Sequence, residues 1–460
     1  MDFDLLFIGA GPAGYEGAIA AAKKGLQAAV VEMDLPGGTC LQRGCIPTKA
    51  ILHSVKAIKQ INDFAKIGVH VEKFQISLDE IKRRKVRIIS KQTRGIELLF
   101  KQNNVQLIKG KAQITGANKI LIDGQKEMSA SNIVIATGSK AAELPFLKWN
   151  GQKIINSDNL LELDSVPETM LVVGAGAVGL EWALIYNYLG CKVTVVEIMD
   201  TIVPGTDKEI AEILKIELVK QNITIHISTA ISNPRLGEKV QLTFKKGDKV
   251  WDEEFAKVLL AVGRTPNSAG IFTGDTPIVL DNKGFIQVSS DLQTAVPNIF
   301  ACGDVIGPPM LAHKAAHQAM AIVDFLVNGT AVPHHPLPAV IFTFPEVATV
   351  GISQEQAAKN NLQVKIGRFP YAASSRANAI DEKTGLVKVI ADQENTILGA
   401  HIVGAEAGEL LPLMTYAVTR KLKCDEFKDL VFAHPTLGEN LWEAMGEIAK
   451  FSIHIMKVAF

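Results

Sequence analysis

Residues Leu5–Glu32 read LLFIGAGPAGYEGAIAAAKKGLQAAVVE, and residues Met170–Glu197 read MLVVGAGAVGLEWALIYNYLGCKVTVVE. The two stretches match at a constant offset of 165 residues, so that Gly9 aligns with Gly174. Each contains an apolar run, a G-x-G-x-x-G turn, a helical segment and a second apolar run that ends in Glu. This order predicts a strand, a tight turn, a helix and a parallel strand, which together form the first unit of a dinucleotide-binding fold.

The glycines of the two turns have separate physical roles. The first permits the tight turn, the second lets the backbone approach a pyrophosphate, and the third lets the helix pack closely on the strand. In that order they are Gly9 and Gly174, Gly11 and Gly176, and Gly14 and Gly179. The helix N-terminus offers free N–H groups to phosphates, and Glu32 or Glu197 would accept a hydrogen bond from a ribose hydroxyl. One Gly-rich turn after a strand is common, but two copies with the same spacing predict two dinucleotide sites.

A second pair of segments also repeats: 132–138 is NIVIATG and 258–264 is VLLAVGR. Each predicts an apolar strand that leads into a turn of small residues beside a nucleotide. The turns place Thr137 and Gly138 at the first site, and Gly263 and Arg264 at the second. Because Glu197 would repel a 2′-phosphate, and residues 198–201 supply no Arg or Lys, we expect NAD rather than NADP at the second site.

Length and charge exclude several classes of protein. A chain of 460 residues is too long for one core, so two to four domains are expected. Lys+Arg and Asp+Glu are both 48, so no global field attracts nucleic acid or an anionic membrane. The acidic start Met1–Asp4 lacks the pattern of a signal peptide, and no apolar run approaches the roughly 18 residues of a membrane span. We therefore expect a cytoplasmic protein without nucleic-acid or membrane partners.

Five cysteines, an odd number, argue against a framework of structural disulfides. Two of them, Cys40 and Cys45, lie in the segment 37–49, GGTCLQRGCIPTK. Two thiols at this spacing can form a small disulfide ring at a helix start, where the helix dipole stabilises a thiolate. A zinc half-site or two buried inert thiols are the alternatives, but the other cysteines are single and no metal site is predicted. The spacing favours redox function.

The segment GGTCLQRGCIPTK resembles the active-site signature of the FAD-dependent disulfide reductases, and of the dihydrolipoamide dehydrogenases in particular. The resemblance covers nearly the whole chain. It includes ACGD at 301–304, PMLAHKA at 309–315, FTFPEVA at 342–348 and HPTLGE at 434–439. It implies that Asp304 and the segment containing Ala312 contact FAD, that an interface domain begins near Phe342, and that His434 is catalytic.

The resemblance implies a reaction for the cysteine pair. His434, oriented by Glu439, would deprotonate a dihydrolipoamide, which would attack the Cys40–Cys45 disulfide at Cys40. Cys45 would then pass electrons to FAD, and NAD+ would accept a hydride.

The resemblance also implies positions and partners. Lys49 would lie against the flavin and pair with Glu181. The protein would be a homodimer with an active site shared between subunits. Its partners would be the lipoyl domains of 2-oxo-acid dehydrogenase acyltransferases or the glycine-cleavage H protein.

The sequence departs from the family pattern in places. Thr48 replaces a Ser, residues 316–319 read AHQA where acidic residues and a glycine are usual, and Thr265 replaces an Arg. Ala112 stands where the family has the second glycine of a G-x-G turn. Its contact with FAD requires a negative φ.

The expected fold class is α/β, with two Rossmann-like dinucleotide-binding domains and a C-terminal α+β interface domain. The expected domains are 1–147 for FAD, 148–271 for NAD, 272–341 as a central return to the flavin, and 342–460 as the dimerisation domain.

Other enzymes of the same fold are alternative functions. Glu197 and Leu437 argue against a glutathione reductase. Mercuric and large thioredoxin reductases are opposed by the lack of C-terminal cysteines, and a soluble transhydrogenase by the cysteine pair itself. A catalytically silent subunit of a 2-oxo-acid dehydrogenase complex is the non-enzymatic alternative.

Overall fold

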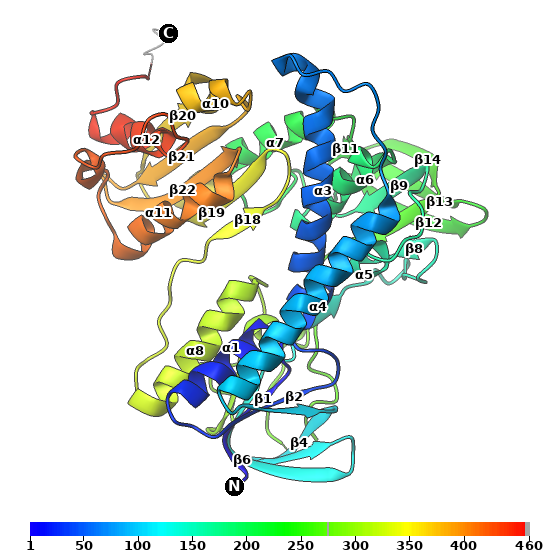
Figure 1. Cartoon of the computed structure of the whole chain (residues 1–460), viewed down its shortest axis with the longest axis vertical. Coiled ribbons are helices and arrows are strands. Elements are labelled where there is room, and N and C mark those ends of the chain that lie inside the picture. The colour runs from blue at the N-terminus through cyan, green and yellow to red at the C-terminus, as the bar shows by residue number, and fades with distance from the viewer. Residues whose placement is uncertain (274–275, 456–460) are drawn as a thin grey trace.

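The computed structural model describes residues 1–273 and 276–455, arranged around three main sheets (Figure 1). The first sheet lies nearest the N-terminus, the second toward one side, and the third, whose strands are drawn in yellow to orange, at the opposite end of the molecule. This arrangement confirms the α/β fold class. In the described part of the chain, no helix is long and apolar enough to cross a membrane.

The first sheet contains the first copy of the repeat. Its strand order is β3-β2-β1-β6-β5-β4, and β17 pairs in parallel with β6. The strands are β1 (Phe3–Ile8), β2 (Ala28–Glu32), β3 (Gln106–Lys109), β4 (Ala112–Gly116), β5 (Lys119–Ile122), β6 (Lys126–Ile135) and β17 (Ile299–Ala301). The helices of this part are α1 (Pro12–Lys23), α2 (Gly38–Arg43), α3 (Cys45–Asp63), α4 (Leu78–Gln102) and α8 (Ala312–Asn328), with the 3-10 turns η1 (Phe64–Ile67) and η2 (Gly303–Ile306). Because β17 and α8 complete this layer, the expected central domain returns to the first sheet.

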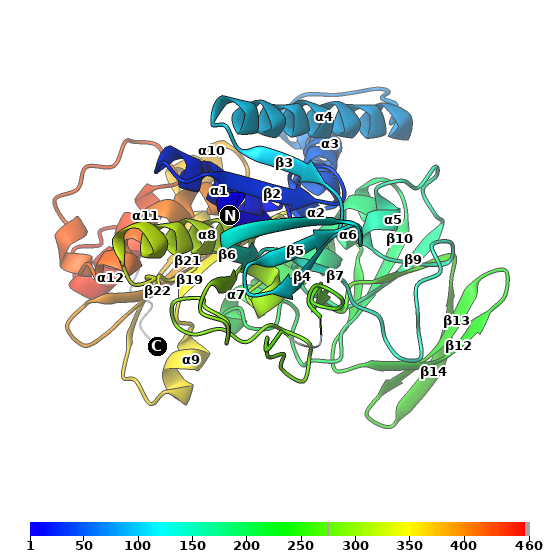
Figure 2. The ribbon, with the colours of Figure 1, turned by 90° about the horizontal axis from the view of Figure 1, so that it is seen from below.

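The second sheet is fully parallel, in the order β11-β10-β9-β15-β8. Its strands are β8 (Ile154–Ile155), β9 (Thr169–Val173), β10 (Lys192–Val196), β11 (Thr224–His226) and β15 (Lys257–Leu260), and its helices are α5 (Ser157–Leu160), α6 (Ala177–Tyr188) and α7 (Lys208–Lys220). An antiparallel sheet of β12 (Ala230–Leu236), β13 (Val240–Lys246) and β14 (Lys249–Phe255) projects from it (Figure 2). The crossing strands β7 (Ser139–Ala141) and β16 (Arg264–Pro266) connect the two units.

The repeat has the same geometry in both sheets. Gly9 and Gly174 each have a φ of +102°, which L side chains rarely adopt. A Cβ on Gly14 would lie 1.8 Å from the carbonyl oxygen of Gly9, and one on Gly179 would lie 2.0 Å from that of Gly174. The first and third glycines are therefore required by the backbone turn and by the close approach of the helix.

The third sheet is antiparallel, in the order β18-β19-β22-β21-β20. Its strands are β18 (Ala339–Ile341), β19 (Glu346–Gly351), β20 (Lys365–Pro370), β21 (Leu386–Ala391) and β22 (Ile397–Gly404). Its helices are α9 (Gln354–Lys359), α10 (Ser375–Ala379), α11 (Ala407–Arg420) and α12 (Glu439–Ala449), with the turns η3 (Tyr371–Ala373) and η4 (Cys424–Phe427). Since β18 already pairs with β19, this sheet begins three residues before the expected boundary at 342.

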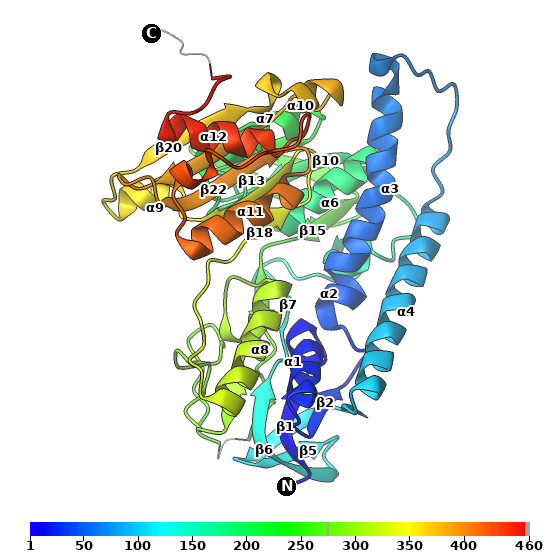
Figure 3. The same cartoon turned by 60° about the vertical axis from the view of Figure 1, so that its left-hand side comes forward.

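Helices α3 and α4 form a long hairpin along one side of the molecule (Figure 3). Helix α3 has 19 residues, which corresponds to a length of about 28 Å. It begins beside the first sheet, and its other end rises to the level of the third sheet. There Lys59 pairs at 3.1 Å with Glu382, which follows α10.

Candidate active site: a thiol pair between two nucleotide-binding units

The thiol pair lies at a junction of two helices. Cys40 is in α2, and Cys45 is the first residue of α3, after the break at Gly44. Both are free thiols, Cys40 partly buried and Cys45 exposed. The structure thus places Cys45 at the helix start that the sequence predicted, where unpaired N–H groups stabilise negative charge.

The charge states of the two sulfurs differ. A hydrogen bond from Cys40, assisted by the charge of Lys49 and opposed by partial desolvation of the sulfur atom, lowers the pKa of Cys45 to about 7. The same hydrogen bond and burial raise the pKa of Cys40. Burial raises the pKa of each of the remaining thiols to about 12; these are Cys191, Cys302 and Cys424. The pair therefore contains one thiol that is about half ionised at neutral pH and one thiol that stabilises the resulting thiolate.

An ion pair between two units of the chain lies one helical turn after Cys45. Lys49 is one turn after Cys45 on α3, and its Nζ is 2.8 Å from Oε2 of Glu181 on α6. The pair expected between these residues is present. The backbone N–H of Phe342 donates to Oε1 of Glu181 at 3.0 Å, and the ring of Phe342 lies 4.6 Å from Lys49 Nζ. The aromatic contact is a feature that the sequence did not predict.

The first nucleotide-binding unit has the loops expected around a dinucleotide. Gly11 is the N-cap of α1, and no atom lies within 4 Å of a Cβ added at Gly138. Oε2 of Glu32 accepts the N–H of Ala10 at 2.6 Å, so this carboxylate braces the Gly-rich turn. Thr137 exchanges hydrogen bonds with Asn267. The backbone of these loops is open to a ligand beside a helix N-terminus, and this arrangement fits the phosphates of FAD.

The other expected flavin positions lie at the same unit. Asp304 in η2 accepts the hydroxyl of Ser139 at 2.5 Å, and Ser139 in turn accepts Arg264 Nε at 2.6 Å. Ala312 is the first residue of α8. Ala112 is buried in β4, and its φ is not positive. This is the backbone conformation that a contact with FAD requires there. Ser139, which connects Asp304 to Arg264, was not predicted.

The second unit contains a cavity of about 590 Å³. Its lining includes the expected residues Gly174, Gly176, Glu197, Gly263 and Arg264. Oε2 of Glu197 accepts the N–H of Ala175 at 2.8 Å, which repeats the bond of Glu32. No atom lies within 4 Å of a Cβ added at Gly176 or Gly263, so the backbone is open to a ligand. The cavity fits a nicotinamide dinucleotide.

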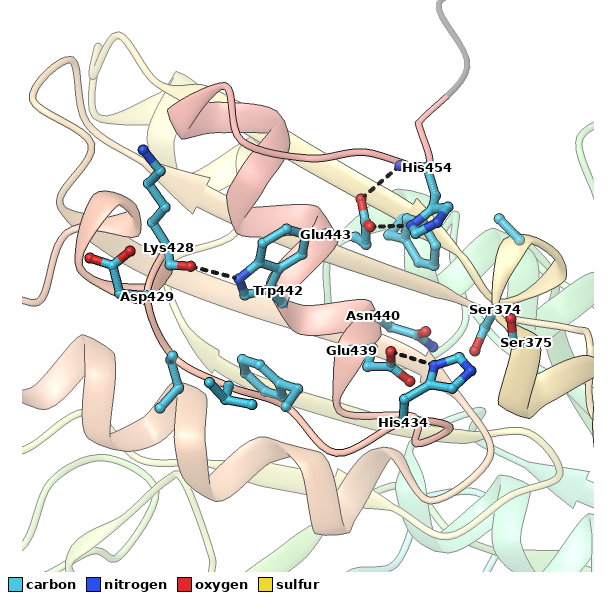
Figure 4. A pocket seen from close by; sticks show the side chains of 15 residues that line it. Ser374, Ser375, Lys428, Asp429, His434, Glu439, Asn440, Trp442, Glu443 and His454 are labelled. Carbon is cyan, nitrogen blue, oxygen red and sulfur yellow. Dashed lines mark hydrogen bonds and ion pairs between the residues drawn. The ribbon is translucent and has the colours of Figure 1, made fainter.

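His434 and Glu439 form a pair in a different pocket. Nδ1 of His434 is 2.9 Å from Oε1 of Glu439, and Oε2 accepts the N–H of Thr436 at 2.8 Å (Figure 4). The His434 side chain is 68% exposed. The pocket has a volume of about 500 Å³, and neither Cys40 nor Cys45 lines it. Within the chain, the expected base and the expected disulfide are therefore held apart.

Two nucleotide-binding units of one repeat, joined to a thiol pair of unequal pKa, define an oxidoreductase that transfers electrons between nucleotide cofactors and sulfur. The chain belongs to the pyridine nucleotide-disulphide oxidoreductases, whose family model matches residues 3–319. The model of the family's dimerisation domain matches residues 337–445. Members of this family use FAD and NAD(P).

Curated relatives match over nearly their whole length. The mitochondrial dihydrolipoyl dehydrogenase of Dictyostelium discoideum is 38% identical over 98% of this chain and 95% of its own. The dihydrolipoyl dehydrogenase of Thermus scotoductus is 35% identical over 99% of both chains. Among solved structures, LpdA from Mycobacterium tuberculosis has a TM-score of 0.89 and 26% identity over 96% of this chain and 99% of its own. The flavoprotein disulfide reductase RclA from Escherichia coli, with a TM-score of 0.85 and 24% identity over 96% and 99%, shares the fold.

Proposed function

We propose that this protein is a dihydrolipoyl dehydrogenase, which oxidises dihydrolipoamide and reduces NAD+. The observation that carries the proposal is the thiol pair at the start of α3, with a pKa of about 7 at Cys45 and the Lys49–Glu181 ion pair beneath it. Full-length similarity to dihydrolipoyl dehydrogenases supports the choice of substrate.

The chain's own residues supply the sulfur chemistry. One thiol of the substrate gives its proton to Nε2 of His434 and attacks Sγ of Cys40 in the disulfide form, and Cys45 leaves as a thiolate. The second substrate thiol then attacks the sulfur bound to Cys40, which closes the substrate disulfide. Cys40 is released and takes back a proton, so two electrons remain on the thiol pair. Bound FAD supplies the route by which two electrons reach NAD+ as a hydride.

Residue positions support cofactor assignments within the family. FAD would be held by the turn Gly9–Gly14, Glu32, Lys49, Ala112, Thr137, Gly138, Asp304 and Ala312. NAD would be held by the turn Gly174–Gly179, Glu197, Gly263 and Arg264, while Glu181 would position Lys49 against the flavin. Among the described residues that line the second cavity, Arg264 is the only cation, and it is bonded to Ser139. This lining supports NAD over NADP, because a 2′-phosphate would meet Glu197 without a free basic partner.

The separation of His434 from the thiols supports a shared active site. The match to the dimerisation domain supports a homodimer. In that dimer the exposed His434 of one chain would serve the Cys40–Cys45 pair of the other. The protein-bound substrate would be a lipoyl domain of a 2-oxo-acid dehydrogenase acyltransferase or the glycine-cleavage H protein.

The proposal is tested by measuring turnover of four combinations of substrate and coenzyme. Lipoamide and glutathione disulfide would each be assayed with NADH and with NADPH. We expect lipoamide with NADH to be at least a hundredfold faster than the other combinations. Faster reduction of glutathione disulfide would reject the substrate assignment, and faster turnover with NADPH would reject the coenzyme assignment.

A further inference from the structure

A second histidine–carboxylate pair lines the pocket that holds His434. Glu443 lies one helical turn after Glu439 on α12, and its Oε1 is 2.6 Å from Nδ1 of His454. Oε2 of Glu443 accepts the backbone N–H groups of Ile453 and His454 at 3.1 and 3.2 Å. Glu439 has the same arrangement. Its Oε1 bonds to an imidazole, and its Oε2 accepts a backbone N–H.

The second pair has the charge environment of an acid–base group. The Glu443 carboxylate is 4% exposed, whereas the His454 imidazole is 70% exposed. Burial raises the pKa of Glu443, but hydrogen bonds from Ser452 and His454 outweigh it, so the pKa lies below its ordinary value. An ionised carboxylate at Nδ1 fixes the tautomer of the ring, which leaves Nε2 as the proton acceptor. Over the described residues, Nε2 of neither His434 nor His454 has a hydrogen-bond partner in the protein.

Asn440 provides independent evidence that this pocket receives a ligand. It lies on α12 between the two glutamates and is 1% exposed, and neither polar atom of its carboxamide has a hydrogen-bond partner among the described residues. A buried amide without a partner costs about 1–3 kcal/mol. Figure 4 shows this side chain between the imidazoles of His434 and His454.

The walls of the pocket also fit a small thiol substrate. Apolar side chains line it, namely Phe369, Leu430, Val431, Phe432 and Trp442. Its volume of about 500 Å³ is within the range of small-molecule sites, roughly 300–1,000 Å³. Two proton acceptors over an apolar wall suit a short alkyl chain that carries two thiols.

We propose that His454 and Glu443 form a second acid–base pair, which takes the proton of the second thiol of the substrate. This assignment rests on the proposed function, because only a dithiol has a second proton to lose. The first thiol gives its proton to His434, forms a bond to Sγ of Cys40 and releases Cys45 as a thiolate. The second thiol gives its proton to Nε2 of His454.

The sulfur exposed by this second deprotonation attacks the substrate sulfur of the mixed disulfide. The bond to Cys40 breaks, and Cys40 takes the proton held by His434. The substrate is oxidised to its cyclic disulfide, the thiol pair gains two electrons, and one proton leaves His454 for the solvent to which it is exposed.

The test compares His454→Gln with Ser452→Ala in the FAD-loaded protein. Gln at 454 can still donate to Glu443 but cannot accept a thiol proton at neutral pH, whereas Ser452→Ala keeps the imidazole and removes one of the hydrogen bonds that hold the Glu443 carboxylate and the C-terminal segment. The value of kcat/KM for dihydrolipoamide with NAD+ would be measured from pH 6 to 10. We expect His454→Gln to lose about a hundredfold at pH 7. The loss should shrink above the ordinary thiol pKa of about 8.5, because the substrate then ionises by itself.

The comparison variant Ser452→Ala should lose far less than His454→Gln at pH 7, because it keeps the imidazole that accepts the proton. Reduction of ferricyanide by NADH, which needs no dithiol, should be unchanged in both variants. An unchanged rate in His454→Gln would overturn the proposal, and so would equal, pH-independent losses in both variants, which would identify a purely structural anchor. Failure of the parent protein to oxidise dihydrolipoamide at any pH would instead reject the proposed function.

Discussion

At the scale of single residues, the charge of Cys45 controls what the thiol pair can do. Its pKa of about 7 arises mainly from the hydrogen bond of Cys40, with a further contribution from Lys49. We expect the two-electron-reduced, FAD-loaded protein to show a long-wavelength charge-transfer band from the Cys45 thiolate to oxidised FAD. The band should be full well above pH 7 and fade as the pH falls through about 7, because protonation removes the donor.

Two substitutions identify the sulfur responsible for this band in absorbance titrations. Cys45→Ser should abolish the band. Cys40→Ser should show it without any reductant, because the hydroxyl at position 40 can still donate to the thiolate. The reverse pattern would exchange the roles of the two cysteines.

Glu197 should determine coenzyme choice through its charge. Glu197→Gln keeps an oxygen that can accept the N–H of Ala175 but removes the repulsion of a 2′-phosphate. We expect the ratio of kcat/KM for NADH to that for NADPH to fall by about tenfold, which corresponds to roughly 1.4 kcal/mol. Glu32→Gln is the matched control, because it changes the same bracing bond in the first unit. An equal change of the ratio in both variants would show that the preference does not depend on the charge of Glu197.

At the scale of elements, a buried ionic cluster joins α7 of the second unit to the third sheet. Lys388 on β21 is 2.9 Å from Asp207, the N-cap of α7, and the two side chains are 1% and 0% exposed. Lys388 is also 2.9 Å from Glu209, which pairs with Arg368 on β20. We expect Lys388→Met to reduce the free energy of unfolding by about 3–5 kcal/mol, because it leaves Asp207 charged and buried.

Chemical denaturation followed by circular dichroism would measure this loss. The double variant Lys388→Met with Asp207→Asn should recover part of it, since no unpaired charge remains. Burial raises the pKa of Asp207, but Lys388 outweighs it, so the pKa lies below the ordinary 3.8. A carboxyl with a lowered folded pKa contributes stability above its unfolded pKa and loses it as the pH falls. The parent protein should therefore lose more stability below about pH 4 than the double variant does.

The features that the sequence motifs predicted directly are those set by neighbouring residues of the chain. The positive φ of Gly9 and Gly174, and the contact between Gly14 and the Gly9 carbonyl, are requirements of one turn, and the motif expresses them directly. The pairs His434–Glu439 and Lys49–Glu181 followed from resemblance and are present. Phe342 over Lys49 and the pair His454–Glu443 were missed, because they depend on how distant segments pack and no spacing marks them.

At the scale of the whole molecule, the long helix α3 separates the two halves of the proposed chemistry. Cys45 begins this helix of about 28 Å, whereas its far end is fixed to the third sheet through Lys59 and Glu382. The pocket of His434 is lined by Ser374 and Ser375, which belong to the same third unit. We expect a helix of this length to keep His434 away from the thiols of its own chain, as the proposed shared site requires.

The shared site is tested by mixing two inactive variants, Cys45→Ser and His434→Ala, after reversible dissociation. In a mixed dimer one site carries both defects, while the other combines an intact Cys45 with an intact His434 from the partner. Random mixing makes about half of the dimers mixed, each with one of two sites competent, so roughly a quarter of the parent's dihydrolipoamide oxidation should return. Mixing two samples of the same variant is the control and should restore nothing. If each site were built within one chain, every site in the mixture would carry a defect, and activity would stay at the level of the separate variants.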